Sequence, residues 1–132
     1  LLQRACMLKC KPVTTPMTAT DKLSADIGVL LSSDDAKYRN IVGGLQYLTI
    51  TRPDLAFAVN RVCQYLHEPR DTHWSAIKRI MRHVRLTVSF GLHLRPTTSG
   101  VLSAFCDADW AGSPDDRRST GGGGMLCSLV QT

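Results

Sequence analysis

The chain has 132 residues, of which 43% are hydrophobic, 20% are charged and only 6% are aromatic, a composition ordinary for a soluble globular protein. No apolar run approaches the roughly 20 residues that a membrane-spanning helix needs, so we expect no membrane partner. The formal net charge is +5, and most of it falls in residues 70–85. A local excess of this kind suggests a surface that faces a polyanion.

Cysteine and histidine usage argues against disulfides and zinc. The five cysteines are odd in number and form no C-x-x-C pair, so we interpret them as free thiols of a reducing compartment. The four histidines are scattered singly, which does not predict a zinc site. Because residue 1 is Leu, we expect an internal fragment or a clipped product.

Residues 1–33 are expected to form an extended, partly ordered lead-in, since they contain Pro12, Pro16 and many Thr and Ser without periodicity. A first helix is predicted after it, with Ser33 or Asp34 as its N-cap. Its helical spacing is set by apolar residues, namely Tyr38, Ile41, Val42, Leu45 and Leu48. Gly43 and Gly44 weaken this helix by about 1 kcal/mol each relative to Ala, and we expect them to be tolerated where another helix packs closely.

A second helix is predicted in "TRPDLAFAVNRVCQYLHEP", residues 51–69. Thr51 is its expected cap, Pro53 fits the first turn, and Asp54 favours the positive end of the helix. Pro69 is expected to stop it. The buried stripe is Leu55, Val59, Val62 and Leu66.

A third helix is predicted in "DTHWSAIKRIMRHVRLT", residues 71–87, with Ile77, Ile80 or Met81, and Val84 on one face. The three helices together predict a compact antiparallel bundle over residues 34–87. The other sides of the third helix hold the basic residues Lys78, Arg79, Arg82 and Arg85.

Two interpretations of the basic helix stay open. Its cations can bind nucleic-acid phosphates in a salt-dependent, largely sequence-blind manner, or they can form an ordinary solvated face. Trp74 can likewise stack on a base, although its position on the apolar face favours core packing.

After Thr87 the pattern becomes extended, and "VSFGLHL", "VLSAFCD" and "GMLCSLV" are predicted as short strands. The fold class is therefore α+β, with residues 88–132 forming a short, incomplete β segment. Gly121 to Gly124 favour a flexible strand entry over a phosphate loop, because no Lys follows them.

Asp107 and Asp109 follow the apolar run "VLSAF" and would point the same way if the strand continues. Paired carboxylates can bind Mg²⁺, and two-metal phosphodiester hydrolysis uses such ligands. Hydrolysis would need further carboxylates, and none follows Asp116. The residues alone favour an acidic turn over a metal site.

A family resemblance extends this interpretation. The stretch from "KYRNIVGGLQYLTITRPDLAFAVNRVCQYLHEPRDTHWSAIKRIMRHVRLT" through "GLHL" to "SAFCDADWAGSPDDRRSTGG", preceded by "CKPVTTPM", closely resembles the Pol polyprotein of plant copia-type retrotransposons. The resemblance covers nearly the whole chain. It implies the C-terminal part of a reverse transcriptase running into the start of a ribonuclease H domain.

Within this resemblance, the three helices correspond to a thumb-like region that grips the primer–template duplex or RNA–DNA hybrid. Asp107 matches the first catalytic aspartate of the nuclease, a Mg²⁺ ligand, and Asp109 is characteristic of the same motif. The parent is implied to be an RNA-directed DNA polymerase with ribonuclease H activity, and its partners include the remainder of Pol. Its location is implied to be intracellular, in a cytoplasmic virus-like particle or the nucleus, with an organellar relic as another origin.

The chain departs from the family in several places. The polymerase aspartates and the other nuclease carboxylates are absent from it, Leu86 replaces a usual Gly, and "GGGGMLCS" replaces a more apolar start to the second strand. We therefore expect the isolated chain to be catalytically inert, with nucleic-acid binding through the third helix as a residual property. The alternatives are a small helical protein-interaction module and a non-functional relic.

Overall fold

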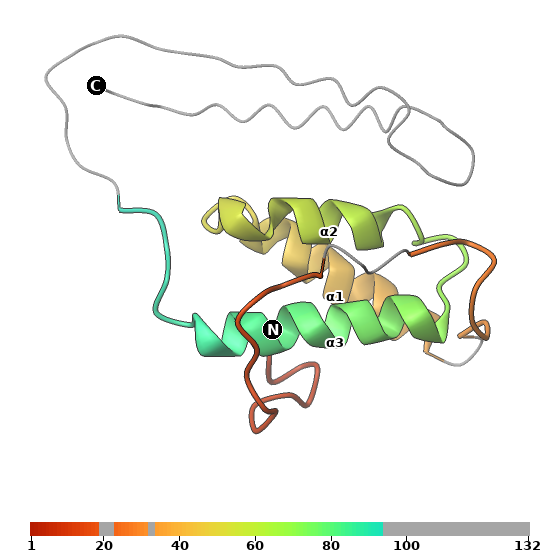
Figure 1. Ribbon diagram of the computed structural model, residues 1–132, viewed down its shortest axis with the longest axis horizontal. Helices are drawn as coiled ribbons and strands as arrows, with labels where there is room; N and C mark the ends of the chain where they lie inside the picture. The colour runs from red at the N-terminus through yellow and green to blue at the C-terminus, as the bar shows by residue number, and fades with distance from the viewer. Residues whose placement is uncertain (19–22, 32–33, 94–132) are drawn as a thin grey trace, which may run out of the picture. The chain divides into compact units, whose positions relative to one another are not determined.

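The computed structural model describes residues 1–18, 23–31 and 34–93. The chain divides into two compact units, Leu1–Leu92 and His93–Thr132, and the helices of the described residues all lie in the first (Figure 1). The predicted strands over 101–107 and 124–130, the glycine run, Asp107 and Asp109 lie outside the described residues. The predicted boundaries 1–33, 34–87 and 88–132 stay predictions.

Helix α1 spans Asp35–Leu48, and the predicted apolar spacing is confirmed. Tyr38, Ile41, Val42 and Leu45 are all buried, whereas Leu48 is half-buried. Asp34 occupies the N-cap position, but its side chain makes no capping hydrogen bond. The helix thus depends on burying one face rather than on its cap.

The helix packing expected around the two glycines of α1 is not found within the described residues. A Cβ on Gly43 would meet nothing within 4 Å. At Gly44 it would meet only the side chain of Leu1, at 2.5 Å. The neighbour at this face of the helix is therefore the start of the lead-in.

The second predicted helix is shorter than expected. It begins as a 3₁₀ turn, η1, over Pro53–Leu55, and continues as α2 over Ala56–Cys63. Thr51 does not cap it, because its hydroxyl donates to the carbonyl of Leu48 at 3.2 Å and Arg52 takes the N-cap position. The chain leaves the helix after Cys63 in turns, well before Pro69.

Helix α3 spans Asp71–Leu86 and confirms the third predicted helix. At its N-terminus, the Nδ1 of His73 accepts a hydrogen bond from the backbone N–H of Arg70, the N-cap residue, at 3.0 Å. Trp74 is half-buried against the core, 6.4 Å from the ring of Tyr38 with Lys37 over its indole, so core packing accounts for it.

Helix α2 lies against both α1 and α3 (Figure 1), and together they enclose one apolar core. The hydroxyl of the buried Tyr38 donates to the carbonyl of Val62 at 2.8 Å, which links α1 to α2 inside that core. The buried apolar residues of the described chain are Leu23, Tyr38, Ile41, Val42, Leu45, Leu55, Ala58, Val59, Val62, Tyr65, Ala76, Ile77, Ile80, Met81 and Val84.

The lead-in packs on this core more closely than its composition predicts. Leu1, Leu2, Ala5, Met7 and Met17 are half-buried against it. Further along, Leu30 and Arg70 form an isolated antiparallel bridge, flanked by backbone hydrogen bonds from Leu31 and Asp71. These contacts fix a segment that has no regular secondary structure.

No strand forms over the described residues 88–93, where a strand was expected. Val88, Phe90 and Leu92 keep their alternation but are exposed. A strand needs a hydrogen-bonding partner for its backbone, and the predicted partner lies outside the described residues. The β part of the fold class therefore stays a prediction, whereas the helical part is confirmed.

The three described cysteines, Cys6, Cys10 and Cys63, are free thiols as expected. Burial raises the pKa of the Cys63 thiol to about 11. No described helix combines the length and the apolar character needed to cross a membrane.

Gly28 provides a test of how the segment before α1 is held. Its φ is +105°, and an added Cβ would lie 2.2 Å from Oδ1 of Asp71. Gly28→Ala is therefore expected to destabilise the chain by about 1–3 kcal/mol, measured by urea unfolding. Gly43→Ala is the matched control, since its Cβ meets open space in a helix and should add about 1 kcal/mol. Equal effects of the two substitutions would contradict this account.

Candidate functional site

The predicted nucleic-acid-binding residues all lie on α3, but they differ in exposure. Lys78 is exposed, whereas Arg79, Arg82 and Arg85 are half-buried. Within the described part of the chain, Lys78 and Arg85 make no hydrogen bond or ion pair. The four cations thus form a mixed set rather than one uniform solvated stripe.

Arg79 and Arg82 are engaged by the lead-in, which composition alone did not predict. Nη2 of Arg79 donates to Oγ1 of Thr15 at 2.8 Å. Nε of Arg82 donates to the carbonyl of Lys11 at 2.6 Å. The lead-in therefore runs beside α3 (Figure 1).

The acceptors on these arginines are neutral, so they orient the guanidinium groups without cancelling their charge. A backbone carbonyl and a hydroxyl satisfy donors, whereas only a carboxylate would neutralise the cation. The acid on α3 itself, Asp71, accepts hydrogen bonds from the N–H groups of Val29 and Thr72. In the described residues the positive charge of this face is therefore retained.

A second polar cluster surrounds Arg52, which the sequence analysis did not single out. Arg52 is only 4% exposed. Its Nε and Nη2 donate to the two carboxylate oxygens of Asp54 at 2.9 and 2.7 Å, and its Nη1 and Nη2 donate to the carbonyl and hydroxyl of Thr87 at 2.8 and 2.7 Å. One buried cation thus joins the turn before α2 to the end of α3.

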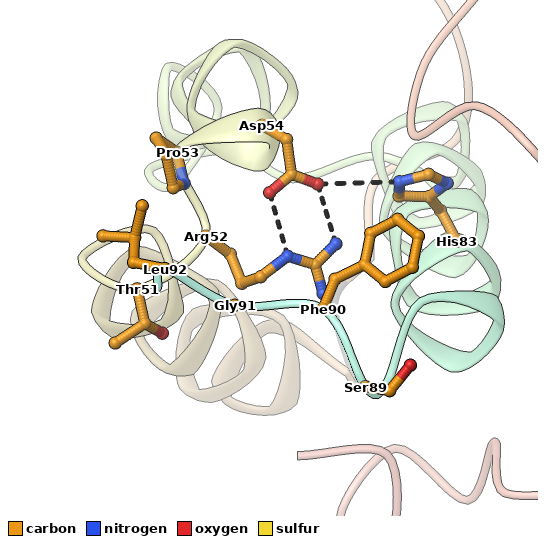
Figure 2. A pocket seen from close by; sticks show the side chains of 9 residues that line it. All are labelled: Thr51, Arg52, Pro53, Asp54, His83, Ser89, Phe90, Gly91 and Leu92. Atoms are coloured by element: carbon orange, nitrogen blue, oxygen red, sulfur yellow. Dashed lines mark hydrogen bonds and ion pairs between the residues drawn. The ribbon is translucent and has the colours of Figure 1, made fainter. Parts of the chain in front are cut away.

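Figure 2 shows how the groups around Arg52 converge. Asp54 lies between Arg52 and His83, whose Nε2 is 3.8 Å from Oδ2 of the carboxylate. Phe90 lies over the guanidinium, with its ring centre 5.7 Å away. Hydrogen bonds from Arg52 hold the pKa of Asp54 below its ordinary value. The carboxylate is therefore stabilised in its charged form.

A cavity of about 590 Å³ opens beside this cluster, lined by residues 51–54, His83 and residues 89–92. The guanidinium that borders it already makes four hydrogen bonds to Asp54 and Thr87. We therefore interpret Arg52 as a residue that holds the chain leaving α3. The only signal in the sequence is the spacing of Arg52 and Asp54 around Pro53.

A third cluster fixes the start of α3. His73 is fully buried, stacks on Tyr65 at 3.9 Å, and its Nε2 lies 3.0 Å from the carbonyl of Ser24. A carbonyl only accepts, so Nε2 bears the hydrogen, while Nδ1 accepts from Arg70. Tyr65 donates to the carbonyl of Leu23 at 2.8 Å. These groups have structural partners and leave no free nucleophile or base.

The predicted metal ligands Asp107 and Asp109 lie outside the described residues. Among the residues that the structure describes, no group of three or more His, Cys, Asp or Glu side chains could hold a metal ion. The cationic face of α3 with the adjoining lead-in is therefore the candidate site in this part of the chain.

Comparison with known proteins identifies the family. The chain is 50% identical over 122 residues to the retrovirus-related Pol polyprotein from transposon RE2 of Arabidopsis thaliana, covering 92% of the chain and 8% of that polyprotein. It is 38% identical over 128 residues to the Pol polyprotein from transposon TNT 1-94 of Nicotiana tabacum, covering 92% of the chain and 10% of that polyprotein. The homologues of the chain are retrovirus-related Pol polyproteins of plant transposons.

A much shorter protein is similar to the chain as well. An uncharacterized mitochondrial protein of Arabidopsis thaliana is 48% identical over 84 residues, which cover 64% of the chain and 73% of that protein. The chain spans about 8% of the length of the first Pol polyproteins that it matches. No family model and no solved structure matches the chain.

The pH dependence of stability tests the Arg52 cluster. The folded-state pKa of Asp54 is lowered by Arg52, so its contribution is fully present above the ordinary aspartate range near 3.9. That contribution is lost as pH falls through the lowered pKa. Asp54→Asn should therefore cost roughly 1 kcal/mol at pH 7, and the difference should shrink towards pH 3 in urea unfolding.

Asp26→Asn is the control for this titration. Asp26 is exposed, and its side chain makes no hydrogen bond within the described residues. The substitution Asp26→Asn should leave the free energy of unfolding nearly unchanged at pH 7. A cost of Asp54→Asn that is the same at both pH values would contradict the ion-pair account.

Proposed function

We propose that the chain is the segment of a copia-type Pol polyprotein in which thumb-like helices of the reverse transcriptase lead into the start of the ribonuclease H domain. The main support is that the cations of α3 lack acidic partners in the described residues. Lys78 and Arg85 pair with no carboxylate there, and Arg82 donates to a neutral carbonyl. Uncompensated cations along a helix suit the phosphate backbone of an RNA–DNA hybrid or primer–template duplex.

The partners of the parent protein follow from this proposal. They are the nucleic-acid duplex and the remainder of Pol, and the parent would act in a cytoplasmic virus-like particle or in the nucleus. An organellar relic is the other origin that we propose, supported by similarity to an Arabidopsis mitochondrial protein.

Loss of charge on α3 tests the binding. The full chain is titrated against a fluorescent RNA–DNA hybrid, and anisotropy is measured over a series of salt concentrations. Lys78→Gln combined with Arg85→Gln should reduce the slope of log affinity against log salt by about two, one for each phosphate contact.

Lys37→Gln combined with Arg39→Gln is the matched control. These exposed residues lie on α1, and the pair removes the same formal charge. A slope that falls equally in both double variants would indicate a nonspecific charge effect. Binding by the unaltered chain that ignores salt would refute the proposal.

Nuclease chemistry belongs to the intact parent in this proposal. Asp107 would be a catalytic residue and Mg²⁺ ligand of the ribonuclease H site, with Asp109 beside it, and carboxylates elsewhere in Pol would complete the site. Two aspartates cannot hold two metal ions in hydrolytic geometry, so the isolated chain should not cleave.

Incubation with a labelled RNA–DNA hybrid and Mg²⁺ measures this directly. We expect no cleavage product beyond the level seen with Asp107→Ala. Cleavage that needs Mg²⁺ and disappears in Asp107→Ala would show an autonomous nuclease and contradict the expectation.

A protein-interaction module is the second candidate function. The observation that favours it is apolar exposure at the Arg52 cavity, where Phe90 is 64% and Leu92 is 53% exposed. Such a surface suits contact with other parts of Pol or with another protein. Self-association that is insensitive to salt, without hybrid binding, would favour this candidate.

A further inference from the structure

The first part of the lead-in, residues 1–18, is itself a cationic segment. Residues 1–18 contain Arg4, Lys9 and Lys11 and no Asp or Glu. This segment lies against α3, the other strongly basic segment of the chain. Two segments of the same charge that are distant in sequence are therefore held side by side.

The contacts between the two segments run antiparallel. Lys11 meets Arg82, Val13 meets His83, and Thr15 meets Arg79 one turn earlier on α3. Nδ1 of His83 lies 3.3 Å from the carbonyl of Val13 and acts as the donor, since a carbonyl only accepts. Three successive attachments thus fix residues 11–15 along one side of the helix.

These contacts partly bury two arginines of α3, whereas lysines of both segments stay exposed. Arg79 and Arg82 are half-buried beneath the lead-in, and Nε of Arg79 is buried without a hydrogen-bond partner in the described residues. Lys9 and Lys11 are exposed, as is Lys78 on α3. Exposed cations are therefore present both on the lead-in and on the helix against which it lies.

Placing like charges together without an acid costs free energy, because each cation raises the local potential. In the described residues no carboxylate pairs with Lys9, Lys11, Lys78 or Arg85. A bound polyanion would remove this cost, because its phosphates would release their counterions and contact the fixed cations of the protein instead. The juxtaposition is thus best suited to a bound phosphate backbone.

We propose that the nucleic-acid footprint is composite: Lys9 and Lys11 of the lead-in bind phosphates together with Lys78 and Arg85 of α3. Arg79 and Arg82 are positioning residues that hold the lead-in beside the helix. The partner is the backbone of an RNA–DNA hybrid or primer–template duplex, contacted without base readout. This inference rests on the proposed function of α3 and adds a second binding segment to it.

Removal of the two lysines tests the footprint in the full chain. Lys9→Gln combined with Lys11→Gln should reduce the salt slope of hybrid binding by about two, as measured by fluorescence anisotropy. Lys37→Gln combined with Arg39→Gln again removes the same charge from α1 and should leave the slope nearly unchanged. Thermal unfolding by circular dichroism verifies that each variant stays folded.

A charge-conserving pair tests the positioning role. Arg79→Lys combined with Arg82→Lys keeps the net charge but loses the planar fork of donors that reaches Thr15 and Lys11. If these arginines hold the lead-in, the slope should fall towards that of the Lys9 and Lys11 double variant although no charge is lost. A purely electrostatic or stabilising role would leave the slope unchanged.

The outcomes separate this inference from the proposed function. A normal slope or tighter binding in Lys9→Gln combined with Lys11→Gln, together with a reduced slope in the Lys78 and Arg85 double variant, would overturn the composite footprint and leave the role of α3 intact. No binding by the unaltered chain, or a slope indifferent to both double variants, would overturn both.

Discussion

The described part of the structure depends on a buried guanidinium at one end of α3, the longest helix in that part. Arg52 is 4% exposed and is acceptable in the interior only because Asp54 and Thr87 accept its hydrogen bonds. These bonds tie the turn between α1 and α2 to the residue that follows α3. They thereby decide where the chain leaves the helical unit, and Phe90 covers the cation from the solvent side.

The opposite end of α3 is fixed by a different set of polar contacts, in which side chains again form hydrogen bonds with backbone groups distant in sequence. His73 and Tyr65 use ring nitrogen and hydroxyl groups to hold the carbonyls of Ser24 and Leu23. Asp71 accepts from the N–H of Val29. Segments without secondary structure have backbone groups that need partners, and side chains of the helical unit supply them. The irregular segment around Leu23, Ser24 and Val29 is thus held by side chains of the helical unit.

Apolar periodicity was enough to predict the three helices. Tyr38, Leu55 and Ile77 belong to apolar stripes that recur with the helical period, and all three residues are buried. The ends were harder, since Thr51 bonds back to Leu48 instead of capping α2. The role of Arg52 and the path of the lead-in depend on side-chain-to-backbone bonds between residues far apart in sequence, which no periodic pattern encodes. The predicted cations of α3 lie on one helix as expected. Lys78 is exposed whereas Arg82 is half-buried, because Arg82 contacts the lead-in, whose path the composition did not predict.

The proposed phosphate-binding cations and the proposed metal ligands belong to different units of the chain. The cations of α3 and the lead-in lie in the unit Leu1–Leu92, whose core is enclosed by its own helices. Asp107 and Asp109, which are predicted as metal ligands, belong to His93–Thr132. Phosphate contacts need only charge held in place, while hydrolysis needs several carboxylates brought together around metal ions. The proposed phosphate binding therefore does not require the proposed nuclease site. The lead-in is the part of this scheme most sensitive to change, because its position beside α3 depends on a few hydrogen bonds to neutral acceptors rather than on the core alone.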